Sequence, residues 1–157
     1  MTPIDASPPD DFTVLVAEDD EHDIIAIRRA WRKLGLRNPL VIVHDGEACL
    51  DYLNQRGGTD TGLCRALPGL VLLDLHMPRL DGLGALRAIR ANAETARLPV
   101  VILTTSKAEE DRLRSYDLGA NAYIVKPVGF ENFMAALRTI HDFWQLVECT
   151  EVRHDTC

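Results

Sequence analysis

The hydrophobic pattern of the chain alternates between short apolar runs and longer segments whose apolar residues recur every three or four positions. A short apolar run is typical of a buried strand, and the longer period is typical of a helix that packs one face on a core. The pattern predicts five strands, at Phe12–Ala17, Leu40–Val43, Leu70–Leu73, Pro99–Leu103 and Ala122–Val125. A helix is expected after each strand: one that ends near Gly35, then Glu47–Leu53, Leu83–Ala93, Glu109–Leu118 and Phe130–Val147.

Regular alternation of strands and helices favours a parallel sheet with right-handed crossovers and helices on both faces. The expected fold class is therefore α/β, a doubly wound sheet of five parallel strands. The run Leu70–Leu73 is also compatible with a short helix segment in the core. Pro78 and the Asp81-Gly82 pair that follow it cannot continue a strand, and they indicate a turn.

The flanks and one internal segment differ from this pattern. Residues 1–11 contain three prolines among small and acidic residues, and a disordered arm is expected there. A single domain is expected over residues 12–149, followed by a short tail at residues 150–157. Asn54–Pro68, rich in Gly, Thr and Pro, is predicted to be a surface loop.

Composition narrows the class of protein. A hydrophobic content of 46% over 157 residues is enough for a proper core. The net charge of −7 argues against a binder of nucleic acid or of an anionic membrane. The chain shows no basic leader with an apolar core and no apolar run near the length of a membrane span, so a cytoplasmic protein is expected. The four cysteines have no zinc or disulfide spacing: Cys49, Cys64, Cys149 and Cys157.

Polar residues whose side chains can take part in catalysis or metal binding follow four of the five predicted strands. They are Glu18-Asp19, Asp74, Thr104-Thr105 and Lys126. The carboxyl ends of parallel strands meet at one edge of the sheet, so these groups are expected to converge. Clustered carboxylates need a cation, and oxygen ligands of this kind suit Mg²⁺. A lysine and a small hydroxyl suit a phosphoryl group, and the set indicates phosphoryl transfer onto a carboxylate.

Each of these residues alone has an ordinary structural explanation. Asp74 could be a strand-end residue satisfied by backbone N–H groups. Thr104 could simply end a strand, and Lys126 could be a solvated loop lysine. Tyr123 could be a packed core tyrosine. The combination, rather than any single member, favours the functional interpretation.

Four short segments in this order resemble the motifs of the CheY-like receiver domain of two-component response regulators: V-A-E-D, L-L-D-L-H-M-P, I-L-T-T and Y-I-V-K-P. The resemblance spans roughly Thr13 to Val147. It implies the flavodoxin-like receiver fold, with strand order 2-1-3-4-5.

The resemblance assigns Asp74 as the phosphoacceptor. It implies a Mg²⁺ cofactor held by Asp19 directly, by Glu18 through water, by Asp74, and by the backbone carbonyl of His76. The strand register favours Glu18 and Asp19 as the acid pair and leaves Asp20 to cap the following helix.

For the phosphorylated state, the resemblance implies that Thr104 and Lys126 bind the phosphoryl group of Asp74. Tyr123 corresponds to the aromatic switch residue of the family. The protein is then expected to be a switch, not an enzyme in its own right, although it promotes its own phosphorylation and dephosphorylation. Its output is expected to be protein–protein contact.

Three further segments look like single-domain regulators that are paired with phytochrome histidine kinases: E-D-D-E-H-D-I, N-P-L-V-I-V-H-D-G-E-A-C-L-D-Y-L and D-F-W. A sensor histidine kinase, possibly a bacteriophytochrome, is the partner that this implies. The alternative is a chemotaxis-type or phosphorelay receiver that passes its phosphate to a histidine phosphotransfer protein. An inert receiver used only for binding is disfavoured because no site residue is missing.

A haloacid-dehalogenase-type phosphatase is the rival from another class, because it also uses Asp, Thr, Lys and an acid pair. That family needs a second Asp two residues after the nucleophile, where this chain has His76. Its acid pair also comes last, whereas Glu18-Asp19 comes first here. The order of the motifs therefore disfavours a phosphatase.

The last predicted helix has a wide apolar face. Phe133, Leu137, Ile140 and Trp144 fall on one stripe and should face the sheet. Phe143, Leu146 and Val147 extend the apolar surface beyond that stripe. The end of the helix either tucks against its own domain or forms a homodimer with the preceding helix and the fifth strand. The dimer is favoured, because an exposed apolar patch usually marks an interface.

Overall fold

A computed structural model of the chain describes residues 12–55 and 67–146. The arm predicted at residues 1–11, most of the loop predicted at Asn54–Pro68 and the tail at residues 150–157 lie outside the described residues, as do Val147 and three of the four cysteines. The fourth, Cys49, is fully buried in the core and free.

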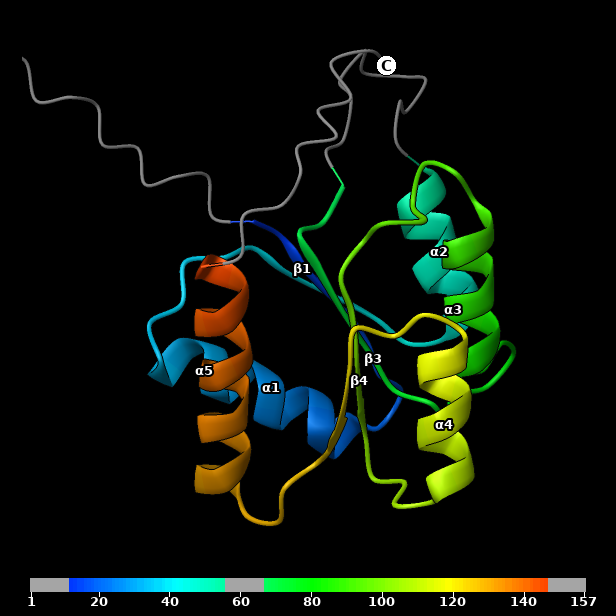
Figure 1. Ribbon diagram of the computed structural model, residues 1–157. Helices are drawn as coiled ribbons and strands as arrows, with labels where there is room; N and C mark the ends of the chain where they lie inside the picture. The colour runs from blue at the N-terminus through cyan, green and yellow to red at the C-terminus, as the bar shows by residue number, and fades with distance from the viewer. Residues whose placement is uncertain (1–11, 56–66, 147–157) are drawn as a thin grey trace, which may run out of the picture.

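In the described part of the chain, five strands alternate with five helices, as the hydrophobic pattern predicts (Figure 1). The elements are β1 (Val14–Ala17), α1 (Glu21–Lys33), β2 (Leu40–Val43), α2 (Gly46–Asn54), β3 (Leu70–Leu73), α3 (Gly82–Ala91), β4 (Val100–Thr104), α4 (Glu109–Asp117), β5 (Ala122–Val125) and α5 (Phe130–Leu146). The bounds of β2, β3 and β5 coincide with the prediction. The first strand begins at Val14, two residues later than expected, and β4 is shifted by one residue.

The strands form one parallel sheet in the order β2-β1-β3-β4-β5. This is the order expected for a flavodoxin-like receiver fold. Helices α1 and α5 cover one face of the sheet, and α2, α3 and α4 cover the other (Figure 1). In the register of the sheet Ala17 pairs with Leu73, and Thr104 pairs with Val125. The residues that follow these strands therefore leave the sheet at the same edge.

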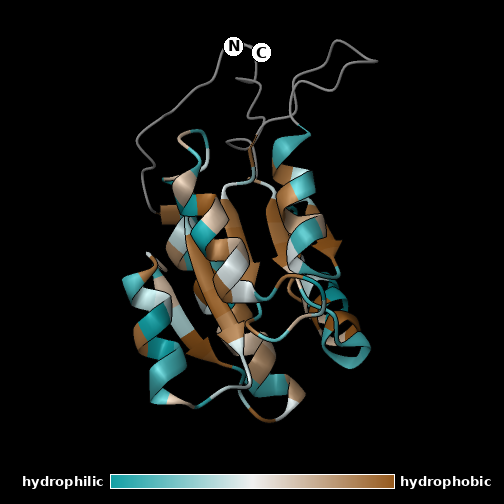
Figure 2. Ribbon diagram, turned by 90° about the vertical axis from the view of Figure 1, so that its right-hand side faces the viewer, coloured by the Kyte–Doolittle hydropathy of each residue, from teal (hydrophilic) through white to brown (hydrophobic). Residues whose placement is uncertain are grey.

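The central strands β1 and β3 are apolar without interruption because both of their faces are buried. Leu15 and Ala17 point into the core under α2 and α3, whereas Val14 and Val16 point into the core under α1 and α5. All four are at most 2% exposed. Figure 2 shows the result, with brown strands at the centre and teal surfaces on the outer faces of the helices.

Aspartate side chains cap three helices. Asp20 accepts a hydrogen bond from the backbone N–H of Asp23, as predicted, and so caps α1. Asp45 and Asp81 cap α2 and α3 in the same way. Such caps satisfy backbone donors that have no partner within the helix. Among the described helices, none combines the length and apolarity that a membrane span requires.

The inward stripe of α5 is confirmed. Phe133, Leu137 and Ile140 are buried in the core that α5 shares with α1. Phe143 and Leu146, however, are 58% and 83% exposed. The end of the helix therefore does not tuck these two side chains against its own domain.

Candidate functional site

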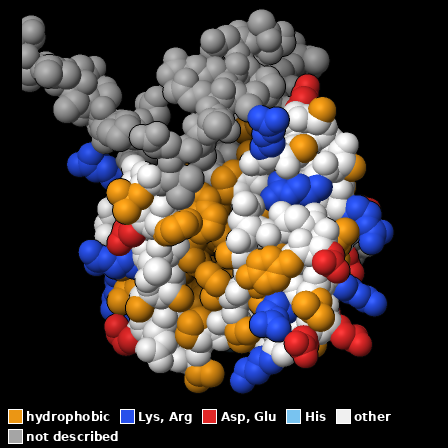
Figure 3. Space-filling model, viewed as in Figure 1, with side chains coloured by type: hydrophobic (Ala, Val, Ile, Leu, Met, Phe, Trp, Pro, Cys, Tyr) orange, Lys and Arg blue, Asp and Glu red, His pale blue; other side chains and the backbone are white. Residues whose placement is uncertain are grey.

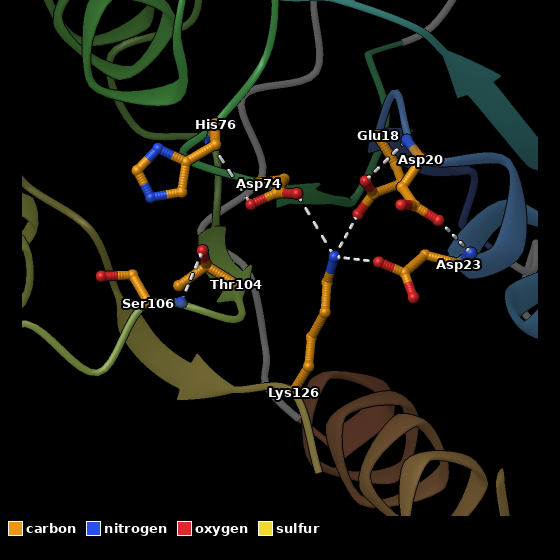
Figure 4. Close-up of polar contacts among 8 residues, drawn as sticks. All are labelled: Glu18, Asp20, Asp23, Asp74, His76, Thr104, Ser106 and Lys126. Atoms are coloured by element: carbon orange, nitrogen blue, oxygen red, sulfur yellow. Dashed lines mark hydrogen bonds and ion pairs between the residues drawn. The ribbon is translucent and has the colours of Figure 1, made fainter. Parts of the chain in front are cut away.

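Three of the predicted site residues meet at the carboxyl edge of the sheet (Figure 4). Glu18 directly follows β1, Asp74 follows β3, and Lys126 follows β5. Nζ of Lys126 lies 2.5 Å from Oε2 of Glu18 and 3.2 Å from Oδ2 of Asp74. The parallel register, rather than sequence proximity, brings these groups together.

Three carboxylates form a compact cluster beside this lysine. One oxygen each from Glu18, Asp19 and Asp74 lies within 4.8 Å of the others. Glu18 and Asp74 are buried, at 2% and 7% exposure, and Asp19 is exposed to solvent. All the donors are carboxylate oxygens, which a hard divalent cation prefers, and one of them belongs to a residue that is exposed to solvent. The residues thus fit such an ion.

The backbone of His76 lies close to the carboxylate of Asp74. Its backbone N–H donates to Oδ1 of Asp74 at 3.4 Å, and its side chain is exposed. The imidazole is turned away from Asp74 (Figure 4). The role of its backbone carbonyl as a metal ligand stays a prediction.

Asp23 is a member of the site that the sequence analysis did not identify. Its Oδ2 accepts a hydrogen bond from Nζ of Lys126 at 2.6 Å. The signal that could have found it is its spacing: Asp23 precedes the buried Ile24 and lies four residues before the buried Ile27, on the side of α1 that turns to the sheet.

Burial dominates the electrostatics of the cluster. Loss of solvent raises the pKa of Glu18 to about 7, and its hydrogen bond and attraction to Lys126 offset only part of this. Burial alone would lower the pKa of Lys126, but its hydrogen bonds to Asp23 and Glu18 outweigh that effect and the pKa is raised. Lys126 therefore stays charged at neutral pH. The pKa of Glu18, by contrast, lies close to neutral pH, so this carboxyl group is partly protonated there.

A glycine, Gly82, packs closely against the backbone of Asp74 and Leu75 at the end of the turn after β3. The backbone N–H of Gly82 donates to the carbonyl of Leu75 at 2.9 Å. A Cβ at this position would collide with the carbonyl oxygen of Asp74 and lie 2.7 Å from Cα of Leu75. The start of α3 can approach the end of β3 this closely only because residue 82 has no side chain.

The hydroxyl side of the site is linked to the predicted switch residue. Thr104 is fully buried, and its Oγ1 accepts a hydrogen bond from the backbone N–H of Ser106 at 3.3 Å. The hydroxyl of Tyr123 donates to the carbonyl oxygen of the same Ser106 at 3.0 Å. Ser106 therefore connects the two predicted residues. Thr105, by contrast, is exposed.

Comparison with known proteins now identifies the family. The family model of the response regulator receiver domain matches residues 14–138, which include every site residue above. The chain belongs to this family. The match decides between the receiver and the phosphatase interpretations in favour of the receiver.

Several known proteins resemble the chain over more than four fifths of its length. It is 36% identical to the probable methanogenesis regulatory protein FilR2 of Methanothrix harundinacea, over 86% of this chain and 84% of that protein. It is 33% identical to the response regulator Rcp1 of Synechocystis, over 83% and 87% of the two chains. The phosphorylated cyanobacterial phytochrome response regulator RcpA superposes with a TM-score of 0.78 at 33% identity, covering 88% of this chain and 96% of that one. The Mn²⁺-bound form of Rcp1 gives 0.77 at 31% identity, covering 89% and 99%.

Proposed function

We propose that this receiver is a phosphorylation switch that accepts a phosphoryl group on Asp74 from a sensor histidine kinase. The observation that carries the proposal is the meeting of Asp74, Lys126 and the cluster of Glu18 and Asp19 at one sheet edge. Phosphoryl transfer depends mainly on positioning and on charge neutralisation, and this edge offers both. We take residues 12–149 as the receiver domain, flanked by an arm and a short tail.

In the reaction, one carboxylate oxygen of Asp74 attacks the phosphorus of a phosphohistidine. The P–O bond to Asp74 forms as the P–N bond breaks, and the imidazole leaves with the bonding electrons and takes up a proton. Lys126 donates to a phosphoryl oxygen. Glu18, Asp19, Asp74 and the carbonyl of His76 are the residues that would hold Mg²⁺, which supplies neutralisation of the phosphoryl charge.

The hydroxyl of Thr104 connects phosphorylation to the surface. When Thr104 donates to the phosphoryl group, its side chain turns and the hydrogen bond from Ser106 is lost. Because Ser106 also accepts from Tyr123, the change reaches the fifth strand and the loop before α4. Tyr123 is in this way the switch residue, and the two arrangements of the loop form a two-state equilibrium that phosphorylation biases.

We infer a phytochrome-type kinase as the partner, in the cytoplasm, where histidine kinases transfer their phosphate. The support is the similarity to Rcp1 and to RcpA, which is described as a phytochrome response regulator. The existence of a Mn²⁺-bound form of Rcp1 supports a divalent cation as a ligand of this receiver. The output of the switch is contact with another protein rather than with nucleic acid.

We propose that the receiver forms a homodimer through the face made by α4, β5 and α5. Figure 3 shows hydrophobic side chains gathered between α5 and α4, over the edge of the sheet. Leu113 and Tyr116 of α4 are 53% and 48% exposed, and Phe143 of α5 is also exposed. β5 is an edge strand, and a second copy would cover both it and these side chains.

A titration with beryllofluoride, a mimic of the phosphoryl group, tests the proposed chemistry. Saturable binding that requires Mg²⁺ should change the fluorescence of the two tryptophans or the amide spectrum of the protein. The Asp74→Asn variant should show no response. A wild-type response that persists in this variant would contradict the assignment of Asp74.

A further inference from the structure

Three carboxylates share the ammonium group of Lys126. Nζ lies 2.5 Å from Glu18, 2.6 Å from Asp23 and 3.2 Å from Asp74 (Figure 4). An ammonium group has three N–H donors, so each donor already has an acceptor in this arrangement. A phosphoryl oxygen can therefore bind Lys126 only if one of the three carboxylates gives up its place.

Asp23 is the carboxylate that can leave most easily. Glu18 and Asp74 belong to the compact acidic cluster, and Asp74 itself is to carry the phosphoryl group. Asp23 is not in that cluster, and its side chain is 31% exposed, against 2% for Glu18 and 9% for Asp74. A carboxylate at the solvent boundary exchanges a lysine for water at a lower free-energy cost than a buried one.

The pairing with Asp23 also has an electrostatic consequence. Asp23 adds one more negative charge to an edge that already holds Glu18, Asp19 and Asp74. A phosphoryl donor is itself an anion, so a further carboxylate within ion-pair distance of Lys126 opposes its approach. The same carboxylate weakens the attraction of Lys126 for the incoming oxygen.

We propose that Asp23 is a positioning residue that holds Lys126 in the unphosphorylated receiver and competes with the phosphoryl group for it. The inference rests on the proposed function of Asp74 and adds that Asp23 slows its phosphorylation. Release of Lys126 from Asp23 is part of the phosphorylation step. The residue therefore limits how fast, and how tightly, the receiver takes up a phosphoryl group.

The test compares Asp23→Asn with Glu21→Gln, which removes the same charge from an exposed side chain on the same turn of α1. Acetyl phosphate serves as the donor, with Mg²⁺: its P–O bond breaks, the bond to Asp74 forms, and acetate leaves. Asp23→Asn should raise the initial rate at least about threefold, whereas Glu21→Gln should stay close to wild type because its charge is screened by solvent.

A double-mutant cycle shows whether Asp23 acts through Lys126. In a Lys126→Gln background, Asp23→Asn should no longer raise the rate or the affinity for beryllofluoride. A merely structural effect of Asp23 would persist in that background. Asp23→Ser provides a second variant without the carboxylate, and thermal unfolding shows which variants are folded.

The outcomes separate this inference from the function on which it rests. If wild type is phosphorylated on Asp74 but neither Asp23 variant is faster, the competition is refuted and the switch function stands. An equal acceleration by Glu21→Gln would mean a general field effect and would also refute it. If wild type is not phosphorylated at all, the proposed function fails, and the inference fails with it.

Discussion

Lys126 Nζ lies 3.2 Å from Oδ2 of Asp74, although the two residues are 52 positions apart and their strands are not neighbours in the sheet. The lysine reaches across the end of β4, whose last residue is Thr104. Charge, hydroxyl and acceptor are therefore contributed by three successive strands. This arrangement is why the site exists only in the folded chain.

The proton on Glu18 makes stability depend on pH. Since burial raises its pKa from 4.5 to about 7, the folded protein holds a proton between these values that the unfolded chain has released. The free energy of unfolding should therefore fall as pH rises through this window, by on the order of 2 kcal/mol from this group. Urea unfolding of the metal-free protein at pH 5.5 and pH 8 measures the effect.

Glu18→Gln should remove that part of the pH dependence, because the amide stays neutral at both values. It should gain stability relative to wild type at pH 8 but not at pH 5.5. Glu21→Gln, an exposed residue, should follow wild type at both. If wild type and Glu18→Gln show parallel pH profiles, the raised pKa of Glu18 is wrong.

Gly82→Ala should disrupt the acceptor loop. The new methyl group would meet the carbonyl of Asp74 and the backbone of Leu75, which are not flexible side-chain ends. A cost of roughly 2–4 kcal/mol in unfolding free energy is expected, together with weaker Mg²⁺ binding. Chemical denaturation and a Mg²⁺ titration measure both.

Gly84→Ala is the matched control, two residues along the same helix. Its Cβ would meet the Cδ1 end of the Leu80 side chain at 2.5 Å, which can move aside. Alanine is also the better helix former by about 1 kcal/mol. This variant should stay near wild type. Equal losses in the two variants would show that the close approach at Gly82 has no special role.

Leu113→Lys should weaken the proposed homodimer, because it places a charge on the exposed apolar part of α4. Sedimentation velocity with Mg²⁺ and beryllofluoride should show a shift toward monomer. Ile25→Lys on α1 changes a side chain that is 61% exposed and lies outside this face, so it should leave the dimer intact. A wild-type receiver that stays monomeric at high concentration, with and without beryllofluoride, would exclude the dimer.

Most of the fold could be predicted because both faces of the sheet are buried. A continuous apolar run such as Leu70–Leu73 then predicts a strand, and the turn residues that follow it favour the strand over a short core helix; its bounds agree with the structure. The predicted start of the first strand was wrong by two residues, because Phe12 packs against the core but lies outside the strand pairing. The capping roles of Asp45 and Asp81 were missed because an aspartate before a glycine indicates a turn as readily as a helix start.

The site was predictable where a residue directly follows a strand, because strand ends converge in any parallel sheet. Asp23 was missed for a related reason: it lies on a helix, and only the packing of α1 shows that its side chain reaches Lys126. The raised pKa of Glu18 could not be predicted from the sequence either, because it depends on how completely the side chain is buried.

The most direct test of the central claim is the mass of the protein after incubation with acetyl phosphate and Mg²⁺, followed by mapping of the modified residue. The account predicts one added phosphoryl group, located on Asp74, that is absent without Mg²⁺ and absent in Asp74→Asn. An unmodified wild-type protein, or a phosphoryl group that remains in Asp74→Asn, would contradict it.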